Sequence, residues 1–171
     1  MECLFIEACK RYDLEKVKRL YNKNDINVQE NNNKAFGNVC VFGSLYIAQW
    51  LYTLEDKPNI HIHDEYAFKQ ACWYGHIDII EWLLTLEDKP NIHINEDQSF
   101  IFACERGFID IVKFLMNLGD KPDIHSQNDS AFRFACELGH LEVAKFLTIL
   151  CEDYSIEIED NKIKSFKIDQ H

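Results

Sequence analysis

The cysteines and histidines are the residues of this sequence whose types could perform chemistry, and there are seven of each. A cysteine beside a histidine is a pair that supports nucleophilic catalysis, and histidines that converge on one point bind zinc. Both types recur at steps of 31 or 32 residues, as Cys9, Cys40, Cys72, Cys104 and Cys136 and as His61, His93 and His125. This regularity indicates that a repeated structural element positions them.

Other residue types keep the step of 32 residues. They include Phe36, Phe68, Phe100 and Phe132, then Gly43, Gly75, Gly107 and Gly139, and also Pro58, Pro90 and Pro122. The string TLEDKPNIHI at residues 53–62 returns unchanged at 85–94 and as NLGDKPDIHS at 117–126. Self-similarity at a fixed period of this length predicts a stacked repeat architecture.

Each unit contains two short helical patterns. Small or apolar residues lie on one face of the first pattern at Phe68, Ala71 and Cys72, and on one face of the second at Ile79, Ile80, Leu83 and Leu84. Gly75 supplies the left-handed turn between them. Pro90 cannot continue a helix, and Ile92-His93-Ile94 alternates as an extended connector does. A helix pair this small must stack on other pairs to bury its apolar faces.

The string at residues 71–84 contains Ala71-Cys72, Gly75-His76, Asp78-Ile79-Ile80 and Leu83-Leu84. It resembles the ankyrin-repeat pattern, and ACELGHLEVAKFL at 135–147 resembles that pattern more closely. The family's Thr-Pro-Leu-His start is replaced by strings such as Tyr66-Ala67-Phe68-Lys69. The use of Phe for Leu and Cys for Ala is similar to the ankyrin proteins of large DNA viruses of amoebae.

The resemblance implies an all-α, ankyrin-type helical repeat solenoid of five helix-turn-helix units with extended connectors. We place the repeats in residues 1–153, with units at 3–23, 34–57, 66–89, 98–121 and 130–153. The first unit is expected to be an N-terminal cap, with Tyr12 where the others have glycine. Alternation around Asp160-Asn161 predicts a β-hairpin cap within residues 154–171, with a frayed tail as the alternative.

The repeat explains the cysteines and histidines without catalysis. The family prefers Ala at the recurring cysteine position, and stacked helices lie about 8 to 10 Å apart, beyond the roughly 7 Å Cα reach of a disulfide. Cys3 and Cys151 fall outside this pattern and are expected to be more exposed. The connector histidines are expected to lie too far apart to share a metal ion, and the family's histidine at His76 and His140 is structural. We expect no metal, no cofactor and no catalytic residue.

The balance of 29 acidic against 18 basic residues gives a net charge of -11. Such a field repels phosphate backbones and anionic lipid surfaces, so neither nucleic acid nor membrane is an expected partner. The sequence contains no stretch of roughly 20 apolar residues, and its start lacks a basic signal-peptide region. We therefore expect an intracellular protein, in host cytoplasm if the viral resemblance holds.

Positions that vary while the skeleton repeats are expected to bind a partner. Trp73 and Tyr74 stand where other units have Val41, Glu105 and Glu137, and Phe42, Arg106 and Leu138. We interpret this pair as an aromatic anchor on the concave face, with core packing of Trp73 as the alternative. An acidic rim, or ordinary solvated surface, is expected at the fingers: His63, Asp64, Glu65, Asn95, Glu96, Asp97, Gln127 and Asp129. The full predicted partner-binding set is Trp73, Tyr74, Lys69, His63, Glu65, Glu105, Arg106, Asn95, Asp97, Arg133, Gln127 and Asp129.

These patterns favour a non-enzymatic module that binds a protein through its concave face and finger tips. The acidic rim indicates a partner with a basic segment, a host protein if the viral resemblance holds. The alternative is a structural or self-associating component of a viral assembly. An enzyme is least favoured, because the sequence contains no Gly-rich phosphate loop, metal-ligand cluster or G-x-S-x-G elbow.

Overall fold

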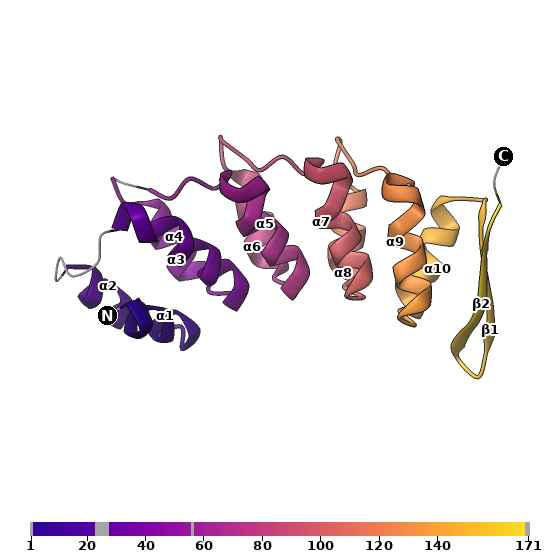
Figure 1. Cartoon of the computed structure of the whole chain (residues 1–171), viewed down its shortest axis with the longest axis horizontal. Coiled ribbons are helices and arrows are strands. Elements are labelled where there is room, and N and C mark those ends of the chain that lie inside the picture. The colour runs from indigo at the N-terminus through magenta and orange to yellow at the C-terminus, as the bar shows by residue number, and fades with distance from the viewer. Residues whose placement is uncertain (1, 23–27, 56, 170–171) are drawn as a thin grey trace. The chain divides into compact units, whose positions relative to one another are not determined.

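A computed structural model describes residues 2–22, 28–55 and 57–169 (Figure 1). The chain divides into two compact units, Met1–Asn91 and Ile92–His171. The described part of the first unit contains α1 (Glu2–Lys10), α2 (Leu14–Asn22), α3 (Val28–Phe42), α4 (Leu45–Tyr52), α5 (Ile62–Tyr74) and α6 (Ile77–Thr85). The second contains α7 (Ile94–Glu105), α8 (Ile109–Met116), α9 (Ser126–Glu137), α10 (Leu141–Leu150), β1 (Tyr154–Glu159) and β2 (Lys162–Ile168).

The helices of the first unit form two layers. One layer holds the first helix of each pair, with α3 in contact with α1 and α5, and the other holds the second helices, with α4 in contact with α2 and α6 (Figure 1). Phe36 and Phe68 are the largest fully buried side chains of the first layer, and Cys40 and Cys72 are buried beside them. Small residues on the stacked faces let neighbouring helices approach closely. The arrangement is that of a helical repeat solenoid, as predicted.

The second unit also has two layers of helices, and it ends in a β-hairpin. Helix α7 contacts α9, α8 contacts α10, and the two strands lie beside α9 and α10 (Figure 1). The ring of Phe132 on α9 stacks on Tyr154 with centroids 4.2 Å apart and meets Phe166 edge-on at 5.8 Å. The hairpin therefore covers the apolar face of α9.

The hairpin follows the predicted sequence positions. Its strands are antiparallel, with Tyr154 opposite Ile168 and Glu159 opposite Lys162. Asp160 and Asn161 have φ angles of 50° and 60°, the left-handed values that a tight two-residue hairpin turn requires. The prediction of a C-terminal hairpin is confirmed.

A left-handed glycine joins the two helices of most pairs. Gly43 has φ 73°, and a Cβ atom there would collide with the ring of His76. The His76 Nε2 atom lies 2.9 Å from the carbonyl oxygen of Val41, and His140 bonds in the same way to the carbonyl of Glu105 at 2.8 Å. The histidine after the turn therefore links one helix pair to the previous one, which agrees with the structural role that the resemblance implies.

The recurring cysteines are buried free thiols, and burial raises the pKa of the Cys9 and Cys136 thiols to about 12. Such thiols are unreactive at neutral pH. Cys151 is also buried, so the prediction that it is more exposed is wrong. It packs against the finger that contains His125, with its Sγ atom 4.0 Å from His125 Nε2. The side chain of Cys3 lies outside the described residues.

Two segments differ from the expected local structure. Helix α3 begins at Val28, ahead of the unit expected from residue 34, and no proline or glycine between them stops a helix. His93 has φ -88° and ψ 4°, which is not the extended backbone that the alternation of Ile92-His93-Ile94 predicts. The chain turns there, and the His93 side chain forms a hydrogen bond with Asp97, four residues later, that holds the turn.

Candidate interaction surfaces

The finger tips are left-handed turns built from residues other than glycine. Three successive residues have positive φ in each, at His63, Asp64 and Glu65, at Asn95, Glu96 and Asp97, and at Gln127, Asn128 and Asp129. This conformation is unfavourable for side chains with a Cβ atom, so other contacts must hold it. In each finger, a histidine and an acidic residue four positions later provide one such contact.

In the first unit, His61 lies between two carboxylates. Its Nδ1 atom is 2.8 Å from Glu65 Oε1, and its Nε2 atom is 2.9 Å from Asp88 Oδ1. A ring that faces acceptors with both nitrogens satisfies both only as the doubly protonated cation. The hydrogen bond with Glu65 is the largest influence and, together with Asp88, raises the pKa of His61 above its usual value despite partial burial.

In the second unit, His93 has the equivalent pair of partners. Its Nδ1 atom is 2.6 Å from Asp97 Oδ1, and its Nε2 atom is 3.1 Å from Asp120 Oδ1. Burial lowers the pKa of His93, but the hydrogen bonds with the two carboxylates outweigh it and leave the pKa raised. The second Asp97 oxygen accepts from the Asp123 N–H at 3.1 Å and from the Ser126 hydroxyl at 2.6 Å.

The last finger ends against the hairpin. His125 Nδ1 lies 2.8 Å from Asp129 Oδ1, and the Tyr154 hydroxyl donates to the same oxygen at 2.6 Å. Burial raises the pKa of Asp129, but the hydrogen bonds with Tyr154 and His125 lower it by a larger amount. The pKa of Asp129 is therefore below its usual value. Burial and the neighbouring Asp129 raise the pKa of Tyr154. The carboxylate therefore fastens the finger to the start of β1.

These contacts change the interpretation of the predicted acidic rim. Glu65 is 5% exposed and Asp97 is 4% exposed, so the prediction that they stand on an exposed rim is wrong. Their carboxylates point inward because the finger turn needs them as acceptors. The sequence held the signal: Glu65, Asp97 and Asp129 recur at steps of 32 residues, each four residues after a connector histidine.

In the first unit, the predicted residues divide between the two ends of α5. Tyr74 is 46% exposed and Trp73 is half-buried, both in the last turn before Gly75, while His63 lies at the finger. The helical stretch from Tyr66 to Tyr74 is about 12 Å long at 1.5 Å per residue. Lys69 lies one helical turn before Trp73 and on the same face. Lys69 and Trp73 therefore share a face of α5, Tyr74 follows at the end of the helix, and all three lie away from the finger.

In the second unit, the predicted residues also divide between the finger turns and helix ends. Gln127 Nε2 donates to the Asn95 carbonyl at 2.8 Å, and Arg133 Nε donates to the Asn128 carbonyl at 3.0 Å. Arg106 is exposed, and Glu105, at the end of α7, is half-buried. Internal hydrogen bonds therefore already engage the side chains of Gln127 and Arg133.

The helix pairs, the left-handed turn glycines and the histidine bridges indicate a single repeat family. The family profile described as Ankyrin repeats (3 copies) matches residues 4–98 and residues 68–160. The chain belongs to the ankyrin-repeat family. Ankyrin repeats are generally protein–protein interaction modules, and their proteins are typically non-enzymatic. No curated protein matches the sequence of this chain.

Two further properties of this ankyrin-repeat chain concern its described residues. None of its described helices combines the length and the apolar character that crossing a membrane requires. Within residues 2–22, 28–55 and 57–169, no three histidine, cysteine, aspartate or glutamate side chains form a group that could hold a metal ion. The connector histidines there bond to carboxylates of their own fingers.

Proposed function

We propose that this ankyrin-repeat chain binds a protein partner through the exposed side of its first helices, with Trp73 and Tyr74 as the anchor. The observation that carries this proposal is the exposure of Tyr74, 46% of whose surface is open to solvent at the end of α5. Exposed tyrosine beside tryptophan is the composition enriched at binding hot spots. The equivalent positions elsewhere hold Glu137 and Leu138, so the repeat skeleton does not require an aromatic pair there.

The partner would present a basic segment. The chain has a net charge of -11, and the exposed finger residues include Asp64 and Glu96. Complementary charge accelerates association and selects partners more than it adds affinity. The partner would be a host protein, met in host cytoplasm, if the resemblance to the ankyrin proteins of amoebal DNA viruses holds.

Affinity capture with matched variants tests this proposal. The intact chain, a Trp73→Ala, Tyr74→Ala variant and a Glu137→Ala, Leu138→Ala variant are each used to capture proteins from lysate of the natural host cell. We expect the control variant to capture the same specific protein as the intact chain and the Trp73, Tyr74 variant to lose it. Equal capture by all three variants would place the binding surface elsewhere. Matching circular dichroism spectra establish that all three are folded.

Self-association is the second candidate function, and exposed apolar residues on α10 favour it. Ile149 and Leu150 are both exposed there, although large apolar side chains usually pack inside. Light scattering over a range of concentrations measures the mass of the particle. An increase in mass that Ile149→Lys abolishes would support self-association, whereas a constant monomer mass would eliminate it.

A further inference from the structure

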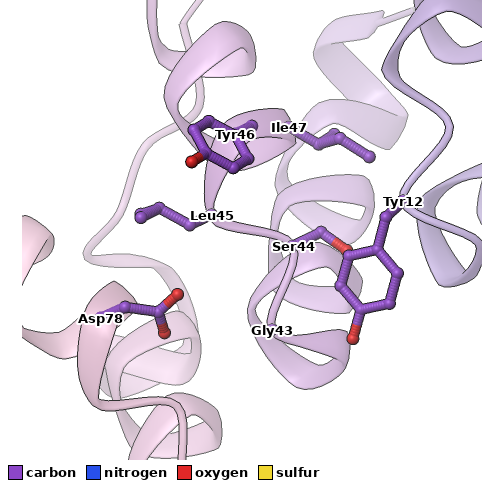
Figure 2. Close-up of a pocket in the computed structure, with 7 residues that line it drawn as sticks. All are labelled: Tyr12, Gly43, Ser44, Leu45, Tyr46, Ile47 and Asp78. Carbon is purple, nitrogen blue, oxygen red and sulfur yellow. The ribbon is translucent and has the colours of Figure 1, made fainter.

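The first unit has a cavity at the turns that join its helix pairs. Its volume is about 270 Å³, and it is lined by Tyr12, Asp78 and the segment from Gly43 to Ile47 (Figure 2). In Figure 2, Tyr12 lies on one side of this segment, with Tyr46 and Asp78 on the other. Because pockets for drug-sized ligands have volumes of about 300 to 1,000 Å³, this cavity suits a single long side chain.

Both tyrosines of the cavity depart from the repeat. Tyr12 has φ 57° at the turn position where Gly43, Gly75, Gly107 and Gly139 stand in the other units. Tyr46 stands in the first turn of its helix, at the position where later second helices have Asp78, Asp110 and Glu142. Acidic side chains stabilise the N-terminus of a helix, and a tyrosine does not. A bulky residue at positive φ is a conformational outlier. Two locally unfavourable choices that meet at one cavity indicate a role other than folding.

Neither tyrosine ring is used to build the core. Tyr12 is 62% exposed, and within the part of the chain that the structure describes its side chain makes one hydrogen bond, from its hydroxyl to the Phe42 carbonyl at 2.7 Å. Tyr46 is 78% exposed and makes no hydrogen bond or ring contact with the described residues. The hydroxyl bond fixes the Tyr12 ring at the edge of the cavity. The aromatic surface therefore remains open to a partner.

Asp78 adds a negative charge to the same cavity. Its side chain is exposed, and its Oδ1 atom accepts a hydrogen bond from the Ile79 N–H at 2.9 Å. Among the described residues it forms no ion pair. The other carboxylate oxygen can thus accept from a donor outside the chain.

We propose that this cavity receives the cationic end of a lysine or arginine side chain from a partner protein. The aromatic faces of Tyr12 and Tyr46 attract a cation, and Asp78 supplies the counter-charge. The first unit already contains this type of contact, with Lys10 Nζ 5.1 Å from the Phe42 ring centroid and Lys57 Nζ 4.7 Å from that of Tyr52. An anionic group would meet the Asp78 charge, and a purely apolar group would leave that charge without a partner. The site adds a second contact to the proposed function and does not rest on Trp73 or Tyr74.

Titration of the intact chain with small probes tests this site. The probes are N-acetyl-lysine amide, N-acetyl-arginine amide and the uncharged N-acetyl-norleucine amide, and the readout is the NMR shift of the Tyr12 and Tyr46 ring protons. We expect both cationic probes to shift these signals and the norleucine probe to leave them unchanged. The ratio of the two cationic affinities identifies the preferred side chain.

Three variants separate this site from general attraction to an acidic protein. Asp78→Asn keeps the oxygen that accepts from Ile79 and removes the charge, and Tyr46→Ala removes one ring; each should weaken affinity about two- to five-fold. Asp110→Asn makes the same charge change at the equivalent position of α8 and should leave the affinity unchanged. Equal weakening by the two aspartate variants, or equal binding of norleucine, would overturn the proposal. Unchanged circular dichroism establishes that each variant is folded.

Discussion

The two ends of the helix pairs use their carboxylates in different ways. At the finger end of the second unit, Asp97 is buried and receives hydrogen bonds from His93, the Asp123 N–H and Ser126. At the turn end of the first unit, Asp78 is exposed, and from the described residues its side chain receives one hydrogen bond, from the N–H of Ile79, the next residue of its helix. The same residue type thus supports the fold at one end and remains available to a partner at the other.

This difference shows that a column of acidic residues in a repeat is not by itself a binding surface. The carboxylates of Glu65 and Asp97 accept hydrogen bonds inside the finger turns, because successive left-handed residues need internal contacts to hold them. They are therefore not available to a partner. The two fingers differ even so: among the described residues, the second carboxylate oxygen of Glu65 is buried without a hydrogen-bond partner, whereas the second oxygen of Asp97 has two. Surface charge therefore has to be assigned residue by residue.

Asp97→Ala should give the largest loss of stability. The substitution removes a buried acceptor from three donors, the Asp123 N–H, the Ser126 hydroxyl and His93. An unmatched buried donor costs about 1 to 3 kcal/mol, and because these donors are only partly buried we take the low end for each. We expect the free energy of unfolding, measured by urea denaturation, to fall by about 3 kcal/mol. Glu96→Ala is the control, because Glu96 is exposed in the same left-handed turn, and it should change the value by less than about 0.5 kcal/mol. Equal effects would mean that the finger carboxylates are ordinary surface charges.

Gly43→Ala and Gly139→Ala compare two turns of the same backbone conformation. Both glycines have positive φ, but a Cβ at Gly43 would meet the His76 ring, whereas one at Gly139 would meet nothing within 4 Å. Left-handed strain alone costs about 1 kcal/mol, and loss of the bond between His76 and the Val41 carbonyl adds about as much. We expect losses of about 2 kcal/mol for Gly43→Ala and about 1 kcal/mol for Gly139→Ala in urea denaturation. A larger effect at Gly139 would contradict the structural role of His76.

The repeat made the fold predictable from the sequence, because Phe36, Phe68, Phe100 and Phe132 at a fixed step can be explained only by stacked copies. The hairpin was equally predictable, because Asp160-Asn161 is a dipeptide that favours a tight turn and it lies between two runs of alternating apolar and polar residues. The start of helix α3 was harder to predict from the repeat, because the period places that unit from residue 34, and only the local capping pattern of Asn27 and Glu30 marks a start at Val28.

The candidate sites were less predictable because side-chain direction depends on backbone that the repeat pattern does not show. From the sequence, Glu65 and Asp97 are interpreted as exposed acids, but the left-handed finger turn directs their side chains inward. Tyr12 departs from the glycine of the other turns, but only the folded chain shows that it lines the same cavity as Tyr46 and Asp78. Cys151, outside the cysteine pattern, is buried with its Sγ atom against His125 of the last finger.

Because of the connector histidines, we expect the free energy of unfolding to depend on pH. The folded pKa values of His61 and His93 are raised above the unfolded value of about 6.5, so both bind protons more tightly when folded. Their contribution is complete below about pH 6.5 and is lost as pH rises through the folded pKa values. Because both rings are partly exposed, we expect less than about 1 kcal/mol per histidine.

Urea denaturation of the intact chain and of a His61→Gln, His93→Gln variant from about pH 5 to about pH 8.5 measures this contribution. The difference in unfolding free energy between the two proteins should shrink as pH increases. A difference that grows with pH would show that the histidines are folded in their neutral form. Asp129 acts in the opposite sense: its folded pKa is lowered, so its contribution is present at neutral pH and is lost as acid protonates the folded carboxylate.

Asp78→Ala should have a small effect on stability, and it tests whether the two ends of the helix pairs differ. The side chain is exposed, and within the described residues its only hydrogen bond is with the neighbouring Ile79 N–H. Its removal therefore costs the interaction of one acid with a helix N-terminus, about 0.3 to 1 kcal/mol. We expect the free energy of unfolding to fall by no more than that, against about 3 kcal/mol for Asp97→Ala. If the two substitutions prove equally costly, the turn-end carboxylate belongs to the fold and is not available to a partner. A small cost, together with loss of binding to N-acetyl-lysine amide, would identify Asp78 as a charge that the fold leaves available for recognition.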